Sequence, residues 1–347
     1  MERLDFRWRT HIASVQHRLL TANLDKDKKG DKTMKKLTSV LIALVLTFSC
    51  AAALAAPVIG INQYGEHASL DNCREGFIQG LADAGLEEGK DFEISYQNAG
   101  FDNSIATQIA QNFSANNVAL MCAIATPSAT ACYAAAEDKD IPVVFTAITD
   151  PEAAGLVNGN VTGTSDKLPV EAQLDLIRKL QPDAKTIGIL YTTSEPNSVS
   201  AIAEYEEKAP EYGFTIEALG VTAQSEVTQA ADTLISKGVD CMSNLTDNNV
   251  VGVLSSILEK TDAAGIPVYG SEVEQVKLGC VASAGIDYVA LGRQTGMMAA
   301  KILTGEASAY DMPYETIAEY GIYVNRAALA SFGIALPEDI DQAAIDA

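Results

Sequence analysis

Small polar and acidic side chains recur directly after the apolar, strand-like segments of this 347-residue sequence. Hydroxyl side chains at the start of a helix can hold an anionic group, because the exposed N–H groups and the helix dipole supply a favourable field. Carboxylates at corresponding positions can hold a cation. The two kinds together suit a small zwitterion such as an amino acid. The candidate ligand-binding residues are Tyr64, Glu66, Thr126, Ser128, Thr146, Asp150, Ser194, Asn197, Asp247 and Glu272.

The candidates divide into two groups with opposite chemistry. Thr126 and Ser128 follow an apolar run in the first half and are expected to receive a carboxylate. Asp247, with Glu272 as a second candidate, is expected to receive an ammonium group in the second half. These residue types also cap helices, so capping alone explains any single one of them. Their recurrence after most strands favours a ligand site.

Each of five further candidates allows two interpretations, as a ligand-binding residue or as a residue with only a structural role. Ser194 and Asn197 are expected to complete the wall of the site, or they only cap a helix. Tyr64 either stacks on a ligand or packs at the cleft edge. Glu66 either contacts the ligand or is a solvated loop charge. Asp150 precedes a proline, which is typical of a turn.

Catalytic chemistry is poorly supported by the residues. His67 is the sole histidine after residue 55, and it is either a ligand contact or a general base. A base needs a partner nucleophile, and no paired Ser or Cys is identifiable. The sequence has no CxxC motif, no Cys/His cluster, no GxGxxG and no P-loop. No catalytic residue, metal or cofactor is therefore predicted, and an exported α/β enzyme is the less favoured alternative.

Alternating strands and helices are expected to position these residues. The pattern runs from residue 57 to 145 and restarts at 186, which predicts an α/β fold with two Rossmann-like lobes. Their parallel sheets would be flanked by helices, and ligands bind at the carboxyl ends of such strands. The junction is predicted near residue 182, after a helix at 170–180. The predicted strands are 57–62, 92–96, 118–124, 142–145, 186–190, 214–219, 239–242, 266–269, 280–284 and 316–324.

The first 55 residues are expected to be a leader and not part of the fold. Residues 34–36 are basic at two positions, 37–48 form an apolar run, and Ala-Leu-Ala at 53–55 matches a cleavage site. This pattern predicts a signal peptide at 34–55, with 1–33 lying upstream of the true start. Two alternatives stay open: an uncleaved anchor, and a lipoprotein acylated at Cys50.

The charge of residues 56–347 limits the kinds of partner that this part of the chain can bind, and its cysteines raise the question of disulfides. The protein has a formal net charge of −22, and residues 56–347 alone carry −27, which argues against nucleic acid and anionic membrane surfaces. Cys122 and Cys132 are expected to be buried free thiols. An oxidising compartment leaves a Cys241–Cys280 disulfide open.

Short segments spread over residues 58–335 resemble those of one family. The chain is similar to substrate-binding proteins of ABC transporters, in the tryptophan/tyrosine group that is associated with aromatic amino acids. The segments are EHASLD at 66–71, REGF at 74–77, AIATP at 123–127, ITDP at 148–151, GNVTG at 159–163, SEPNS at 194–198, TDN at 246–248 and GIDY at 285–288.

The resemblance implies a type I periplasmic-binding-protein fold, in which two lobes joined by three crossovers close around a ligand. We expect one lobe at 56–182 plus about 288–312, and the other at 183–287 plus about 313–347. The implied function is capture of an amino acid, with Trp, Tyr or Phe favoured, by a periplasmic monomer that serves ABC permease subunits. Another amino acid or a small carboxylate is the alternative ligand, and a ligand-sensing module for a receptor is the alternative role.

Overall fold

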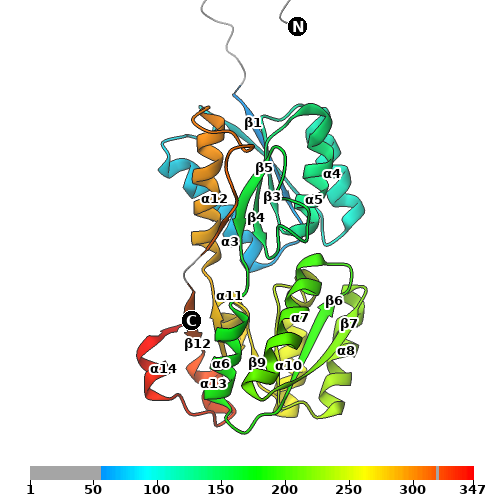
Figure 1. The fold of residues 1–347 in the computed structure, drawn as a ribbon, viewed down its shortest axis with the longest axis vertical. Coiled ribbons are helices and arrows are strands. Elements are labelled where there is room, and N and C mark those ends of the chain that lie inside the picture. The colour runs from blue at the N-terminus through cyan, green and yellow to red at the C-terminus, as the bar shows by residue number, and fades with distance from the viewer. Residues whose placement is uncertain (1–55, 318–319) are drawn as a thin grey trace, which may run out of the picture. The chain divides into compact units, whose positions relative to one another are not determined.

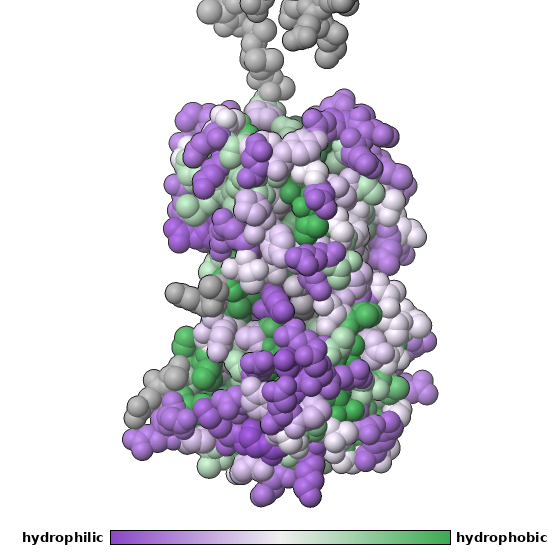
Figure 2. Space-filling model, viewed as in Figure 1, coloured by the Kyte–Doolittle hydropathy of each residue, from purple (hydrophilic) through white to green (hydrophobic). Residues whose placement is uncertain are grey.

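The computed structural model describes residues 56–317 and 320–347. The predicted signal peptide and Cys50 lie outside the described residues. From Ala56 onward the chain forms two lobes, each built on a parallel sheet with helices on both faces (Figure 1). Most apolar side chains of the lobes are buried in their cores. The face shown in Figure 2 is largely hydrophilic, with small apolar patches.

The first lobe contains a six-stranded parallel sheet in the order β11-β5-β4-β3-β1-β2. Strands β3 and β4 are buried along their whole length, as expected when helices cover both faces. Helices α3 and α12 pack on one face, and α4 and α5 on the other (Figure 1). The elements are β1 (Val58–Gln63), α3 (Ala68–Asp83), β2 (Glu93–Asn98), α4 (Asn103–Ala115), β3 (Leu120–Ile124), α5 (Thr126–Ala136), β4 (Val143–Ile148), β5 (Val161–Ser165), α12 (Tyr288–Leu303) and β11 (Glu315–Thr316).

The second lobe repeats this plan with the parallel order β7-β6-β8-β9. Backbone hydrogen bonds from Val281 to Val268 and from Gly270 to Ala282 extend that sheet into β10. Strand β12 then pairs antiparallel with β10 and parallel with β13. The strands are β6 (Thr186–Thr192), β7 (Thr215–Val221), β8 (Cys241–Ser243), β9 (Val268–Tyr269), β10 (Ala282–Gly285), β12 (Gly321–Val324) and β13 (Ala344–Asp346).

The helices of the second lobe pack on the two faces of its sheet and form a hydrophobic core on each face. Helices α6 and α7 pack into one, and α8 and α10 into the other, on opposite faces of β6. Ile187 and Ile189 face the first core and Leu190 the second, following the two-residue period of a strand. The helices are α6 (Val170–Leu180), α7 (Pro196–Lys208), α8 (Gln224–Lys237), α9 (Asn248–Val251), α10 (Leu254–Ala264), α11 (Val273–Leu278), α13 (Arg326–Ser331) and α14 (Glu338–Ala343).

The chain crosses between the lobes three times, and two crossings differ from the prediction. Helix α6 buries Leu174 and Ile177 in the core of the second lobe, so the first crossing lies before Val170 and not near residue 182. The predicted strand 316–324 is two strands, because β11 pairs with β5 and β12 pairs with β10. Amphipathic spacing identifies a buried face but not the lobe that covers it, which explains both errors.

The five described cysteines, Cys73, Cys122, Cys132, Cys241 and Cys280, are buried and free. The expectation of free thiols at Cys122 and Cys132 is confirmed. The Cys241–Cys280 disulfide is not formed, so that alternative is wrong in this structure. No helix in residues 56–317 or 320–347 is long and apolar enough to cross a membrane.

Helices α3 and α12 touch backbone to backbone. A Cβ added to Gly76 or Gly80 of α3 would lie 2.1 Å from a carbonyl oxygen of α12, and a Cβ on Gly292 or Gly296 would lie 2.1 Å from a carbonyl of α3. Glycine at these four positions is therefore required by space. The contact joins the returning helix α12 to the first lobe and brings the N-termini of both helices to one end of it.

We predict that Gly80→Ala lowers the free energy of unfolding by about 2 kcal/mol, because the added methyl group overpacks the contact with the Arg293 carbonyl. Urea denaturation followed by circular dichroism measures this change. The control is Met297→Ala, which removes an exposed side chain from α12 and should change the free energy by less than about 0.5 kcal/mol. An unchanged midpoint for Gly80→Ala would contradict the proposed role of this contact.

Candidate functional site

A narrow cavity of about 20 Å³ lies where the two lobes meet. This volume has room for about one water molecule, so the two lobes lie close together here. Residues of both lobes contribute, most of them from strand carboxyl ends and helix N-termini. The lining residues are His67, Ser69, Leu70, Ala147, Asp166, Thr246, Asp247, Asn248, Val251, Glu272, Gln275 and Tyr288.

The backbone beside this cavity is strained at two non-glycine residues. Ala147 has φ 58° and Ala125 has φ 78°, both in the left-handed region. The register between β4 and β5 also shifts between Phe145 and Ile148. Such strain and bulges gather at ligand sites, where they re-aim strand ends. Here they turn the end of β4 so that Ala147 lines the cavity.

Asp166 is a buried carboxylate in the cavity wall that no cation contacts in the described structure. It directly follows β5 and accepts hydrogen bonds from the Thr149 hydroxyl at 3.0 Å and the Tyr288 hydroxyl at 2.5 Å. Burial raises the pKa of Asp166, and the two hydroxyl donors oppose that shift. Thr149 also lies 2.8 Å from Thr246 of the second lobe, measured between hydroxyl oxygens.

Glu272 is a second buried carboxylate in the wall, and it links the lobes. Its side chain accepts a hydrogen bond from the Ser69 hydroxyl of the first lobe at 3.0 Å. It also caps α11 by accepting from the backbone N–H groups of Glu274 at 2.6 Å and Gln275 at 3.0 Å. Burial raises the pKa of Glu272 to about 7. This carboxylate therefore has donors but no positive partner.

Asp247 lines the cavity, but both of its oxygens are engaged within the second lobe. It accepts from the Thr192 backbone N–H at 2.5 Å, the Thr192 hydroxyl at 2.9 Å, the Ser198 hydroxyl at 2.7 Å and the Val250 N–H at 2.9 Å. Four donors occupy the acceptor positions that a carboxylate offers. Asp247 thus fastens β6, α7 and α9 together.

Glu195 lies behind Asp247 and is held by amides. It accepts hydrogen bonds from the side chains of Asn197, Asn248 and Asn249 at 2.7 to 3.1 Å. Burial, and then the charge of Asp247, raises the pKa of Glu195 to about 8. Glu195 does not itself line the cavity.

His67 presents an unpaired imidazole to the cavity. Both ring nitrogens are buried without a hydrogen-bond partner. Burial lowers the pKa of His67 to about 4, and the neighbouring Asn248 amide opposes that shift only in part. The ring lies parallel to that of Phe101, with centroids 6.3 Å apart. The side chain is therefore neutral at physiological pH.

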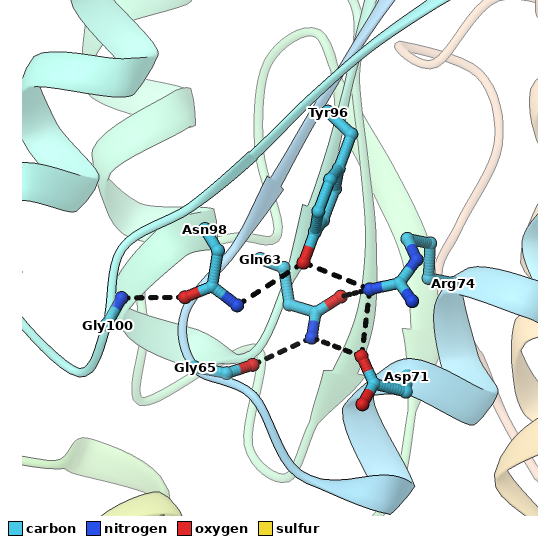
Figure 3. A network of polar contacts seen from close by, with 7 residues as sticks. All are labelled: Gln63, Gly65, Asp71, Arg74, Tyr96, Asn98 and Gly100. Carbon is cyan, nitrogen blue, oxygen red and sulfur yellow. Dashed lines mark hydrogen bonds and ion pairs between the residues drawn. The ribbon is translucent and has the colours of Figure 1, made fainter.

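Arg74 is the basic residue nearest to His67 in the sequence. Its side chain already makes hydrogen bonds and an ion pair with other residues (Figure 3). One of its guanidinium nitrogens contacts the Gln63 side-chain oxygen at 2.6 Å, Asp71 at 2.8 Å and the Tyr96 hydroxyl at 3.0 Å. Gln63 in turn donates to the Gly65 carbonyl at 2.7 Å. This network fixes the loop after β1 that leads to His67. No Lys or Arg is among the residues that line the cavity.

The structure places the predicted residues unevenly. Asp247 and Glu272 line the cavity, whereas Glu66 and Ser194 are exposed. Asp150 accepts a hydrogen bond from Ser200 at 2.6 Å, so it bridges the lobes outside the cavity.

The other predicted residues are buried and do not line the cavity. Ser128 donates to Asn62, and Thr146 contacts Cys73 and Thr164. Asn197 donates to Glu195 and to the Thr246 carbonyl. Tyr64 donates to the Phe101 carbonyl, and the hydroxyl of Thr126 is buried without a partner.

Sequence reasoning missed Asp166 and Tyr288 as site residues. The segment Val161–Ser165 is rich in Thr and Gly and was not predicted as a strand, so the residue after it was not considered. The rule that ligands bind at strand carboxyl ends identifies Asp166 once β5 is known. Tyr288 opens α12, and its role depends on a crossover that periodicity does not reveal. The described residues contain no group of three or more His, Cys, Asp or Glu that could hold a metal ion.

Two lobes, three crossovers and a cavity between them define a binding protein of the type I periplasmic-binding-protein fold. The sequence matches the family described as ABC transporter substrate binding protein over residues 58–347, and the chain belongs to this family. The protein is therefore a substrate-binding component and not an enzyme. Substrate-binding proteins of this kind work outside the cytoplasm.

Three relatives sharpen this assignment. The tyrosine-binding protein of Clostridioides difficile is 39% identical over 277 residues, which cover 78% of this chain and 79% of that protein. A crystal structure of a Streptococcus pneumonia ABC domain in complex with L-Trp is 32% identical, with a TM-score of 0.80, and covers 84% of this chain and 99% of that one. The ligand-free, open structure of a Clostridium difficile substrate-binding protein is 38% identical, with a TM-score of 0.63 and the same coverage.

The two solved structures differ in how well their lobes match. The relative with the higher identity has the lower TM-score, and it is the open, ligand-free one. The lobes of this protein are therefore arranged more like those of the L-Trp complex. The contacts that Ser69 and Thr149 make across the cavity agree with a closed form.

We predict that the pKa of Glu272 gives the protein a distinctive pH dependence. The folded form holds a proton on Glu272 that the unfolded form releases, so the free energy of unfolding falls as pH rises from about 4.5 to about 7. The contribution is on the order of 3 kcal/mol. Glu272→Gln lacks this titration and should show a shallower slope in urea denaturation between pH 5 and pH 8.

Glu75→Gln is the matched control, because Glu75 is exposed on α3 and its loss should leave the slope unchanged. A Glu272→Gln slope equal to that of the unmodified protein would contradict the proposed burial of this carboxylate.

Proposed function

We propose that the protein captures an aromatic L-amino acid between its lobes and delivers it to an ABC permease. The observation that carries the proposal is a cavity with buried carboxylates at Asp166 and Glu272 and no Lys or Arg in its wall. A buried carboxylate without a positive partner is costly, so the site favours a ligand that brings its own cation. An amino acid does so with its ammonium group.

Asp166 and Glu272 are the proposed ammonium partners. Each has hydroxyl or N–H donors that orient it and makes no salt bridge to a Lys or Arg among the described residues, since Lys277 pairs with Glu274. This assignment replaces the role first given to Asp247, because four donors of its own lobe already occupy that carboxylate. Asp247 instead holds the second-lobe wall in shape.

The proposed carboxylate site is the first turn of α3. Ser69 and Leu70 line the cavity, and the first intrahelical bond of α3 comes later, from the Asp71 N–H to the His67 carbonyl. The N–H groups of Ser69 and Leu70 are therefore free of helical partners, and the helix dipole favours an anion there. Ser128, which was expected to bind the carboxylate, is engaged by Asn62.

The proposal that the ligand has an aromatic side chain is supported by the residues that line the cavity and by the relatives. Leu70, Ala147 and Val251 give the wall an apolar part. Two relatives more than 30% identical are described with tyrosine and with L-Trp. Import from the periplasm by a monomer that serves permease subunits is also part of the proposal, and the family supports the permease partner.

Calorimetry with the twenty amino acids tests the function. We expect L-Tyr, L-Trp or both to bind best, and 3-(4-hydroxyphenyl)propanoate, which lacks the ammonium group, to bind much more weakly than L-Tyr. Asp166→Asn should weaken L-Tyr binding by on the order of 100-fold, because the ammonium loses a buried charged partner. The same variant should change binding of the deaminated analogue far less.

Asp247→Asn is the matched control. It should lower the stability of the second lobe while keeping the preference for L-Tyr over the deaminated analogue. Loss of that preference in Asp247→Asn, with Asp166→Asn unaffected, would return the ammonium to Asp247. Binding of no aromatic amino acid would refute the proposed function.

A further inference from the structure

His67 is distinctive among the residues of the cavity wall. Within the described structure, its two ring nitrogens are buried and have no hydrogen-bond partner, unlike the other buried polar side-chain atoms of that wall. The other unpaired buried atoms belong to Thr126, Asn197 and Ser283, which do not line the cavity. The imidazole is therefore the polar group that the closed cavity leaves for a ligand to satisfy.

The imidazole is held in place by its surroundings and not by hydrogen bonds. The Phe101 ring lies parallel to it, at an angle of 5°, within the distance range of aromatic pairs. Phe101 itself is fixed between the lobes: a Cβ on Gly65 would overlap its ring at 2.0 Å, and a Cβ on Gly252 would lie 3.2 Å from it. His67 also occupies the N-cap position of α3 without making a side-chain cap bond. Its ring nitrogens thus lie beside the Asn248 side chain without a hydrogen bond of ordinary length.

A neutral imidazole has one donor nitrogen and one acceptor nitrogen. The pKa of about 4 keeps His67 in this form at physiological pH, so it does not repel or replace the ligand's ammonium group. An unpaired buried acceptor lowers the affinity for any ligand that leaves it unpaired. A ligand ring that carries an O–H or N–H removes this penalty, and a bare phenyl ring does not.

We propose that His67 is the residue that selects, among aromatic amino acids, for a ring with a hydrogen-bond donor. Tyrosine with its phenol and tryptophan with its indole N–H meet this condition, and phenylalanine fails it. The inference rests on the proposed function and deepens it by assigning the recognition of the ring. Sites that pair a ligand hydroxyl discriminate strongly against analogues that lack it. For one bond to a neutral group, we expect about 10-fold to 100-fold tighter binding of L-Tyr than of L-Phe.

The test is calorimetry with L-Tyr, L-Trp and L-Phe on the unmodified protein, His67→Phe and His67→Gln. His67→Phe keeps an aromatic ring beside Phe101 and removes both nitrogens. We expect its L-Tyr/L-Phe affinity ratio to fall to about 1, mainly through weaker L-Tyr binding. His67→Gln keeps a donor and an acceptor, and it should retain part of the ratio.

A second measurement covers the case in which His67→Phe does not fold. Nitrogen NMR of histidine-labelled protein should show a shift of the His67 ring signal with L-Tyr and not with L-Phe; the signal is assigned by its absence from His67→Gln. Equal weakening of L-Tyr and L-Phe in His67→Phe would overturn the inference, because it would place His67 at the ligand's carboxylate or ammonium. An unchanged ratio would also overturn it. If the unmodified protein binds no aromatic amino acid, the proposed function fails first and the inference falls with it.

Discussion

Carboxylates buried between two lobes without a cation are the constraint around which this cavity is organised. Asp166 and Glu272 are kept in place by hydroxyl and N–H donors, but donors do not neutralise a charge removed from water. The raised pKa of each carboxyl group reflects that cost. A ligand that supplies an ammonium group stabilises the closed form more than the open one, where water already solvates the carboxylates. Differential stabilisation of this kind is what couples binding to closure.

The fold supports this constraint from both sides of the cavity. Backbone contact between α3 and α12 brings Ser69 and Tyr288 to one end of the first lobe, where they meet Glu272 and Asp166. In the second lobe, Asp247 accepts hydrogen bonds from residues of β6, α7 and α9 and so holds these three elements together. Within the described residues, the side-chain hydrogen bonds between the lobes are few and mostly involve hydroxyl groups, each worth about 1 kcal/mol. Lobes joined in this way can separate to admit and release a ligand.

The sequence predicted the architecture better than the site. Alternating apolar segments identified most strands, and recurring short segments identified the family. The polar strand β5 and the lobe that covers α6 were not visible, because spacing reports that a face is buried and not what buries it. Asp247 was expected to bind the ligand since it follows a strand, yet capping and tertiary hydrogen bonds occupy it. Asp166 became recognisable as a site residue only when the sheet order was known.

A crystal structure of the complex with L-Tyr tests the central claim most directly. We expect the ligand's ammonium nitrogen to lie within about 3 Å of carboxylate oxygens of both Asp166 and Glu272, which is ordinary hydrogen-bond distance. We also expect Asp247 to keep its four donors from the second lobe. An ammonium group that contacts Asp247 in place of those donors, or that faces solvent while Asp166 and Glu272 stay unpaired, would contradict this claim.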